Sequence, residues 1–443
     1  MDRNLRIAKL KEVQTHEPLM SGVNIPYKGS PMRFNAYLIP LENLVYNKYN
    51  GRIGTRVRTY EKEHGPLNPE ELSDVEVIER FLWESHEVQN KNTVDDLLEK
   101  HQQRPGIVTS HGIIVDGNRR ASLLNRIYRN RSEYERQKIN VDHAQYLLAV
   151  ILPEDADQKE ILKLETEYQM GEDPKAEYNP IEKYLKCNQL KEAGFSETDI
   201  AKMMHQKSAT IMEWLEVMDL MESYLSYLGY EGIYTRLDHT EDHFLGLNKA
   251  LKSLREHRVR SNNWIYDDLD VAGLQQIAFD YIRARYEGKE FRSLFQGKGN
   301  LFNTNEETWQ SFAERHHRIR EKACAEEVPV EELREENPDI DISQLLEERD
   351  KAWGEKINDQ MESNLGNHVF KNKSEEEADR PKELAEKAMT ALEAVDTDAA
   401  RFASAEVKDL LLSIQTRVEE LLEEHANKAI DVAYEATIVA DDD

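Results

Sequence analysis

The sequence predicts an α+β protein in which a small α/β domain precedes a mostly helical region and an acidic helical C-terminal region. Two observations support this prediction. Short apolar runs alternate with helical segments up to about residue 155, which is typical of a sheet packed against helices. After Pro153, apolar residues recur at helical spacing. The expected divisions are an N-terminal arm (1–35), the α/β domain (36–155), a helix-turn-helix-like domain (156–240), a helical extension (241–296) and the acidic region (307–443).

Apolar runs and turn residues place the elements of the first two divisions. Residues 1–35 carry Pro and Gly breaks with little periodicity, so we expect an irregular arm there. Strands with their exits are expected at 36–46, 107–109, 112–115 and 146–153. Helices are expected at 68–84, from a cap at Thr93, and directly after Gly117.

The helical region contains a pattern typical of a helix-turn-helix. Helices are expected at 158–170 and 180–193, and Gly194 is expected to end the second one. Ser196 is a candidate N-cap with Asp199 three residues later, so a short helix, a turn at 205–207 and a helix from Ser208 should follow. Met212 and Trp214 are expected in the core.

The remainder is helical with breaks. Residues 297–306 are rich in helix breakers and predict a linker. Helices are expected at 381–395 and 403–427, whereas 364–380 and the final IVADDD are expected to be loosely ordered.

Composition limits the class of protein. The net charge is −28, and residues 321–443 carry 35 acidic and 14 basic residues, so the excess acid is concentrated there. Such a region repels nucleic acid but leaves room for a local basic site in the first two thirds. The two cysteines, far apart, predict neither a disulfide framework nor a zinc site. No stretch approaches the length of a membrane helix, so the expected location is the cytoplasm, without membrane contact.

The segment that carries chemistry is Asp116-Gly117-Asn118-Arg119-Arg120. A strand delivers Asp116 and Gly117 into a tight turn that opens a helix, and the N-terminus of a helix attracts anions. Arg119 and Arg120 add planar guanidinium groups suited to phosphate, and Asn118 is a capping or base-contacting group. The alternative is that both arginines only make salt bridges within the domain or on its surface.

A second basic run, from Arg52 through Arg56 to Arg58, follows another strand exit. Both runs are expected to converge on one anionic ligand. A structure in which both guanidinium groups of the doublet pair with carboxylates, with no cavity beside them, would argue against this site.

The order of these segments resembles the ParB/sulfiredoxin fold. Asn50-Gly51-Arg52 lies where that family has an Asn-Pro-Arg signature, and Asp116–Arg120 lies at its Gly-Glu-Arg-Arg-type phosphate box. Further on, Tyr178–Glu182 and Gly194–Ala201 resemble the ParB central domain. The resemblance covers about 36–225 and implies a pocket for a nucleoside triphosphate with Mg²⁺, CTP in partition proteins and ATP in other branches.

The chain departs from the family at its third nucleotide motif, Glu-Asn-x-x-Arg. The nearest match begins Glu165-Thr166-Glu167, so the Asn and Arg are absent. The resemblance still implies that Glu165 supports the metal. Sulfiredoxin chemistry is rejected because Asn118 occupies the region where a cysteine is needed, and Cys187 is expected to be a packing residue.

The helix-turn-helix-like unit is poorly equipped to read DNA. Segment 179–225 holds five Lys against eight acidic residues, and the second helix begins with no Lys or Arg. The available contacts lie at the turn: Lys202, Gln206, Lys207, Ser208 and Thr210. The alternative is a packing or dimerisation module that keeps the shape without the chemistry.

Three functions remain open. The first is a nucleotide-dependent switch, in which Gly117, Arg119, Arg120 and Arg52 hold phosphates and the helical domain associates with DNA or a partner. The second is an NTPase or nuclease of the same fold, with Glu165 and Asp116 as metal or base carboxylates. The third is a nucleotide-independent assembly protein whose acidic helices self-associate.

Overall fold

The computed structural model describes residues 1–168, 179–256, 264–285, 290–297, 299–376, 381–399 and 401–440. The chain divides into two compact units, Met1–Val369 and Phe370–Asp443. Among the described residues, no helix combines the length and the apolar character that a membrane crossing requires.

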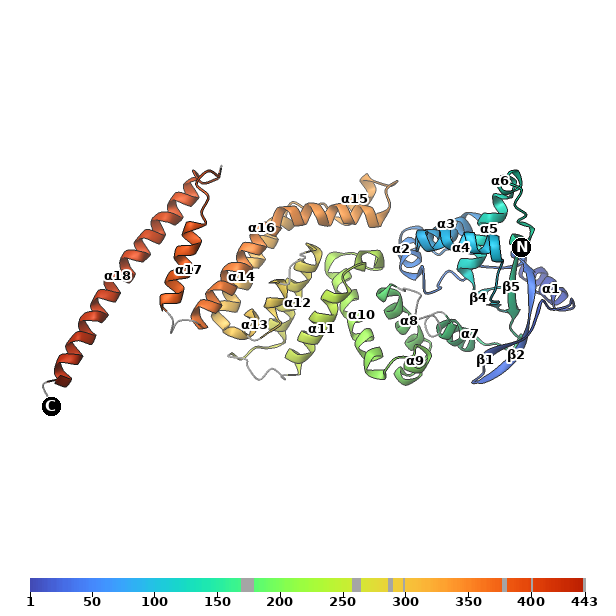
Figure 1. Ribbon diagram of the computed structural model, residues 1–443, viewed down its shortest axis with the longest axis horizontal. Coiled ribbons are helices and arrows are strands. Elements are labelled where there is room, and N and C mark those ends of the chain that lie inside the picture. The colour runs from blue at the N-terminus through green and yellow to red at the C-terminus, as the bar shows by residue number, and fades with distance from the viewer. Residues whose placement is uncertain are drawn as a thin grey trace. The chain divides into compact units, whose positions relative to one another are not determined.

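The first unit begins with a five-stranded mixed sheet (Figure 1). Its strands are β1 (Met20–Tyr27), β2 (Ser30–Pro40), β3 (Gly106–Val108), β4 (Ile114–Asp116) and β5 (Tyr146–Ile151), in the spatial order β1-β2-β5-β3-β4. The central strand β5 pairs antiparallel with β2 and parallel with β3, and β4 is antiparallel to β3. A small sheet followed by helices confirms the predicted α+β class.

Both faces of the inner strands β3, β4 and β5 are buried, which explains why these strands are apolar runs. In β5, Leu147 and Ala149 pack in a core with helices α1 to α5, whereas Leu148 and Val150 pack on the opposite face against α7. The covering helices are α1 (Arg3–Val13), α2 (Gly54–His64), α3 (Leu72–Glu84), α4 (Glu87–Lys100), α5 (Asn118–Arg129) and α7 (Gln158–Thr166).

The expected irregular arm over 1–35 is wrong. These residues form α1, β1 and the start of β2, and the Asp2 side chain caps α1 by accepting from the backbone N–H groups of Asn4 and Leu5. The Pro and Gly residues that look like breaks lie in an edge hairpin, whose turn at Lys28-Gly29 has positive φ at both residues. The α/β domain therefore starts at the N-terminus. The expected cap at Thr93 is also wrong, because α4 already begins at Glu87.

The helices expected in the helix-turn-helix-like unit are present as α8 (Pro180–Glu192), α9 (Glu197–Met203) and α10 (Ser208–Leu228). Ser196 caps α9 as expected, since its Oγ accepts from the N–H of Asp199 at 3.1 Å. Ile200 and Ile211 are buried in the small core between these helices. Trp214 packs on that core, but Met212, expected there too, is 49% exposed.

One apolar core extends from Ile181 in α8 to Leu365 in α16 (Ile342–Glu376). It includes α11 (Glu241–Arg255), α12 (Asp268–Arg283) and α14 (Glu306–Cys324), so the expected helical extension and much of the acidic region pack together with α10. The predicted linker at 297–306 contains the short helix α13 (Leu301–Thr304), and α15 is Val330–Glu336. Loose order was expected at 364–380, but α16 continues through Glu376, so this expectation is wrong for 364–376. Residues 377–380 lie outside the described residues.

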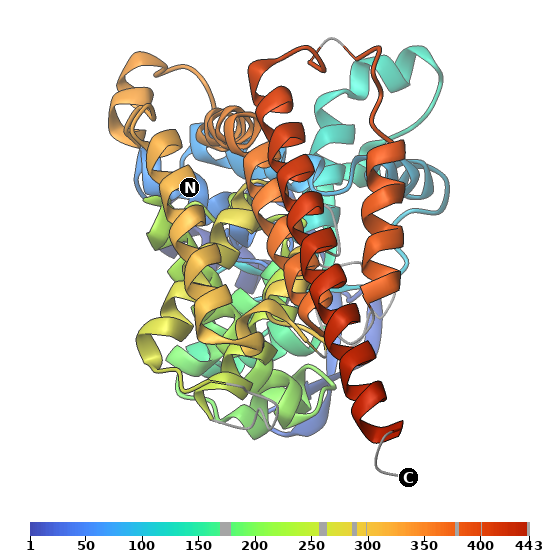
Figure 2. The same ribbon diagram turned by 90° about the vertical axis from the view of Figure 1, so that its left-hand side faces the viewer.

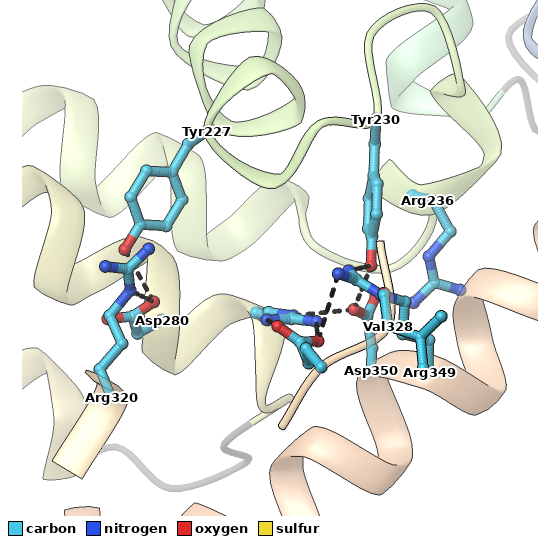
Figure 3. A network of polar contacts seen from close by, with 10 residues as sticks. Tyr227, Tyr230, Arg236, Asp280, Arg320, Val328, Arg349 and Asp350 are labelled. Atoms are coloured by element: carbon cyan, nitrogen blue, oxygen red, sulfur yellow. Dashed lines mark hydrogen bonds and ion pairs between the residues drawn. The ribbon is translucent and has the colours of Figure 1, made fainter. Parts of the chain in front are cut away.

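A buried polar network fixes α16 to this core (Figure 3). The Asp350 carboxylate accepts from Arg236 at 2.7 Å, from Arg283 Nε at 2.9 Å and from the Tyr230 hydroxyl at 2.7 Å. Arg283 also pairs with Glu327. A second carboxylate, Asp280, similarly holds Tyr227, His316 and Arg320. Such groups are stable in a core only when each has its partners.

The second unit consists of the end of α16, α17 (Pro381–Glu393) and α18 (Ala405–Ala440). Figures 1 and 2 show α18 as one unbroken helix, coloured red. The helices expected at 381–395 and 403–427 are confirmed, and α18 continues beyond the second prediction. The final IVADDD is thus helical to Ala440, and residues 441–443 lie outside the described part.

Asp350→Ala should destabilise the protein by about 3–5 kcal/mol, because it leaves the buried guanidinium groups of Arg236 and Arg283 without their carboxylate. Urea denaturation followed by circular dichroism measures this change. The control is Glu355→Ala, an exposed residue of the same helix, which should change the free energy of unfolding by less than about 0.5 kcal/mol. Equal effects of the two variants would contradict the structural role of the network.

Candidate functional site

The arginine doublet lies at the junction of β4 and α5. Gly117 is the N-cap residue of α5 and has φ +110, a backbone conformation that side chains other than glycine rarely adopt. It also has no side chain that could cap the helix, so the first turn of α5 opens toward the space beside it. Asp116, the last residue of β4, borders the same space.

Arg119 is oriented by uncharged groups. Its Nε donates to Asn90 Oδ1 at 2.5 Å and a terminal nitrogen donates to the Thr93 hydroxyl at 3.1 Å. Asn90 is itself fully buried and donates to the carbonyl oxygens of Leu82 and Trp83, at the end of α3. Both bonds orient the Arg119 guanidinium at the cavity, which this side chain lines.

Arg120 is held differently. It forms an ion pair with Asp116 Oδ2 at 2.6 Å and also donates to the carbonyl oxygen of Arg104. Both partners of the ion pair are about one quarter exposed, so the pair borders solvent. The condition that would argue against the site is not met, because a cavity lies beside both arginines.

This cavity has a volume of about 460 Å³. Four arginines line it, Arg52, Arg104, Arg119 and Arg120, against the two carboxylates of Asp96 and Asp116. The size suits a small organic ligand, and the charge balance suits an anion. The remaining lining residues are Asn50, Thr93, Leu97, His101, Gln102, Gln103, Pro105, Gly117, Asn118 and Tyr168.

Two of the expected ligand-binding residues have other roles. Asn118 is buried; its Oδ1 accepts from the N–H of Asn47 and its Nδ2 donates to the carbonyl oxygen of Ile114, so its side chain links the loop at Asn47 to β4. Arg56 lies outside the cavity and pairs with Glu84 at 2.7 Å. Arg52, four residues earlier, does line the cavity, because α2 begins between them and turns Arg56 away.

Glu165 does not lie where a metal ligand or base is expected. Its side chain is 4% exposed and pairs with the equally buried Lys186 of α8 at 3.0 Å, and it is not among the cavity-lining residues. Burial raises the pKa of Glu165 despite this partner. The predicted roles of Glu165 in metal binding and catalysis are therefore not supported by its position; its observed role is to join α7 to α8.

A second buried carboxylate joins α8 to the loop that carries Arg52. Glu182 of α8 accepts from both the N–H and the hydroxyl of Thr55, each at 2.8 Å, in the first turn of α2. The preceding residue must be Gly54, because a Cβ there would lie 2.6 Å from Glu182 Oε2. The first turn of α2 is thus attached to the helix-turn-helix unit by a buried carboxyl group.

The expected packing role of Cys187 is confirmed. Its thiol is fully buried and contacts Met204 Sδ at 3.4 Å, and burial raises its pKa to about 12. A thiol in this environment stays protonated at neutral pH and is a poor nucleophile.

The residues proposed to contact DNA surround the turn between α9 and α10. Lys202, Gln206 and Lys207 are exposed, whereas Ser208 and Thr210 are partly buried. The exposed side of α10 continues with Met212 and Glu213. The structure therefore brings the five residues together around the turn. Two of them, Lys202 and Lys207, carry positive charge.

Sequence reasoning missed Arg104 and Asp96, which both line the cavity. Arg104 precedes β3, and β3 is antiparallel to β4, so residues before one strand must lie beside residues after the other. This pairing of 104 with 116–120 follows from the predicted strands alone. Asp96 belongs to α4, whose packing on α5 has no comparable sequence signal.

Comparison of the chain with family models, with curated proteins and with solved structures finds no match. In the described part of the chain, no group of three or more His, Cys, Asp or Glu side chains is placed to hold a metal ion. The argument for function therefore comes from the geometry of the cavity.

Glu182→Gln should become progressively more stable relative to the unchanged protein as the pH rises from about 4.5 toward neutrality. Burial raises the pKa of Glu182 above its ordinary 4.5. The unfolded chain therefore loses this proton at a lower pH than the folded chain, and ionisation increasingly disfavours the folded state until the pH exceeds the folded pKa. The amide of Gln does not titrate.

Urea denaturation at several pH values measures this difference, with Glu192→Gln, at an exposed position of the same helix, as the control. A stability difference between Glu182→Gln and the unchanged protein that stays constant over this pH range would contradict the argument.

Proposed function

We propose that this chain is a ParB-like nucleotide-binding protein, in which the cavity beside α5 holds the polyphosphate of a nucleoside triphosphate. The observation that carries the proposal is the cavity itself: four arginines and the uncapped first turn of α5 face one space of about 460 Å³. Guanidinium groups and helix N-termini are the groups with which proteins bind phosphate.

The doublet divides the work between its two arginines. Arg119, positioned by Asn90 and Thr93, presents its guanidinium to the cavity. Arg120 exchanges part of its interaction with Asp116 for the phosphate, since a ligand with several negative charges competes well for a partly exposed guanidinium. Gly117 permits close approach of the ligand to the backbone.

Magnesium would accompany the nucleotide chiefly through the phosphate oxygens. Mg²⁺ keeps several water ligands and commonly takes one or two carboxylates beside phosphates. Asp116 and Asp96 line the cavity and are the carboxylates in reach, although each pairs with a cation, Arg120 and Lys100 respectively. Glu165 is excluded from this role by its burial against Lys186.

In this proposal, nucleotide binding itself acts as the switch. The alternative function, an NTPase or a nuclease, is less well supported. Of the two carboxylates expected to act in catalysis, Glu165 is buried away from the cavity and Asp116 is engaged by Arg120. Nucleotide occupancy would instead act through Arg52, whose loop leads directly into the turn of α2 that holds Glu182. The readout of the switch is association with DNA or another partner.

We also propose self-association through α18. Val407, Leu411, Ile414, Val418 and Leu421 recur at alternating spacings of four and three residues, which is the seam pattern of a coiled coil. Leu411, Val418 and Leu421 are 37%, 48% and 48% exposed in the single chain. An apolar seam of this kind is stable in water when a second helix covers it.

Arg120→Ala should weaken nucleotide binding at least tenfold, because a charge-assisted bond to phosphate is worth about 1.5–3 kcal/mol. Calorimetry with CTP, ATP and GTP, each with and without Mg²⁺, measures this. Arg56→Ala is the matched control: it removes an arginine of the same domain whose side chain pairs with Glu84 outside the cavity. No binding of any of the three nucleotides to the unchanged protein would refute the proposed function.

Leu411→Glu together with Leu421→Glu should convert a self-associated species to monomer, since both substitutions put charge into the seam. Light scattering coupled to size-exclusion chromatography gives the molar mass, against 51.6 kDa for one chain. Thr416→Glu, on the other side of α18, should leave the mass unchanged. A monomeric unchanged protein at high concentration would contradict self-association.

A further inference from the structure

The second basic feature of the α/β domain lies at the opposite end of α5 from the cavity. Residues 118–138 contain seven Arg or Lys and two Glu, in a chain whose net charge is −28. The segment comprises α5 and the short helix α6 (Arg131–Arg136), labelled beside α3 in Figure 1. Five of its basic residues are exposed at and beyond the end of α5: Arg126, Arg129, Arg131, Arg136 and Lys138.

Several of these arginines are held by aromatic rings instead of carboxylates. The Arg126 guanidinium lies 3.8 Å from the centre of the Trp83 ring, and that of Arg131 lies 4.9 Å from the Tyr128 ring. Arg136 donates to the carbonyl oxygen of Ser132. Within the described part of the chain, none of these three arginines forms an ion pair. A guanidinium stacked on a ring is fixed in direction while its N–H groups remain directed outward.

The surface between α3 and α5 is hollowed by a groove of about 440 Å³. Arg80, Trp83, Arg126 and Asn130 contribute to it, together with Arg129. Two carboxylates also line it, Glu76 and Glu79, and Glu79 is already paired with Arg129 at 2.5 Å. Glu133 and Glu135 lie on the adjacent α6. The groove thus presents exposed arginines, one of them held over an indole ring, which suits contact with a phosphate backbone.

We infer that the groove between α3 and α5, extended by the exposed arginines of α6, is a contact surface for the phosphate backbone of a nucleic acid. The helix-turn-helix turn offers only two lysines beside an acidic α10, so the arginine surface is the better electrostatic match. Contacts of this kind position a nucleic acid without reading its sequence. The inference stands independently of what fills the cavity at the N-terminus of α5.

The test measures fluorescence anisotropy of labelled mixed-sequence single-stranded and duplex DNA of about 30 nucleotides or base pairs, with salt varied from about 50 to about 200 mM. The protein is the full chain. The main variant combines three changes, Arg126→Gln, Arg131→Gln and Arg136→Gln. The rescue variant has Lys at the same three positions. Lys202→Gln with Lys207→Gln reports on the helix-turn-helix turn. Circular dichroism confirms that each variant is folded.

The expected result is a loss of at least about tenfold in affinity for the triple Gln variant, with the slope of log affinity against log salt reduced by about 2–3. The triple Lys variant should keep the slope. Calorimetry with nucleotides should be unaffected by either variant, which separates a failure of this inference from a failure of the proposed function.

Three outcomes would overturn the inference. The first is loss of binding in the Lys202/Lys207 variant with none in the triple Gln variant, which would place DNA on the helix-turn-helix unit. The second is binding of the unchanged protein to anionic phospholipid vesicles but not to DNA. The third is the absence of DNA binding at the lowest salt concentration.

Discussion

Two buried carboxylates join the α/β domain to the helical domain, and the arrangement of the candidate site depends on them. Glu182 of α8 fills the N-terminus of α2, and Lys186, one turn later on α8, pairs with Glu165 of α7. Removing charged groups from water is costly, so each carboxylate persists only because its partners lie within hydrogen-bonding distance. The first helix of the helix-turn-helix unit is therefore fixed on two sides at once.

This constraint has a consequence for the cavity. Arg52 lines it, and Gly54 and Thr55, two and three residues later, receive Glu182. A ligand that draws Arg52 toward its phosphates acts on a loop whose far end is attached to α8. Coupling between a ligand site and a distant helix requires a connected element with two arrangements, and this loop is one connection between the cavity and the helical domain.

The sequence correctly predicts the α+β class, the inner strands and the place of the doublet at the start of a helix, for identifiable reasons. β3, β4 and β5 are apolar runs because both faces of the sheet are covered, and Ser196 has the capping geometry that its spacing to Asp199 implies. The hairpin at 20–40 was missed because Pro and Gly in an edge strand look the same in sequence as Pro and Gly in a loop. The role of Glu165 was mistaken because no local pattern reveals that Lys186, 21 residues on, will be buried against it. The fold therefore follows from local patterns, whereas the partners of individual charged groups depend on tertiary packing.

The two anion-binding features proposed for this domain lie on one helix, and the dipole of that helix acts differently on each. The N-terminus of α5 is its positive end, where a phosphate is stabilised, and Gly117 leaves that end uncapped. The C-terminus is the negative end of the dipole, which stabilises the positive charges of Arg126 and Arg129 in the last turn. The helix thus holds arginines at its C-terminus while attracting a ligand anion at its N-terminus. Because α5 has twelve residues, its two ends are about 18 Å apart, so the two sites can be occupied at once without sharing a residue.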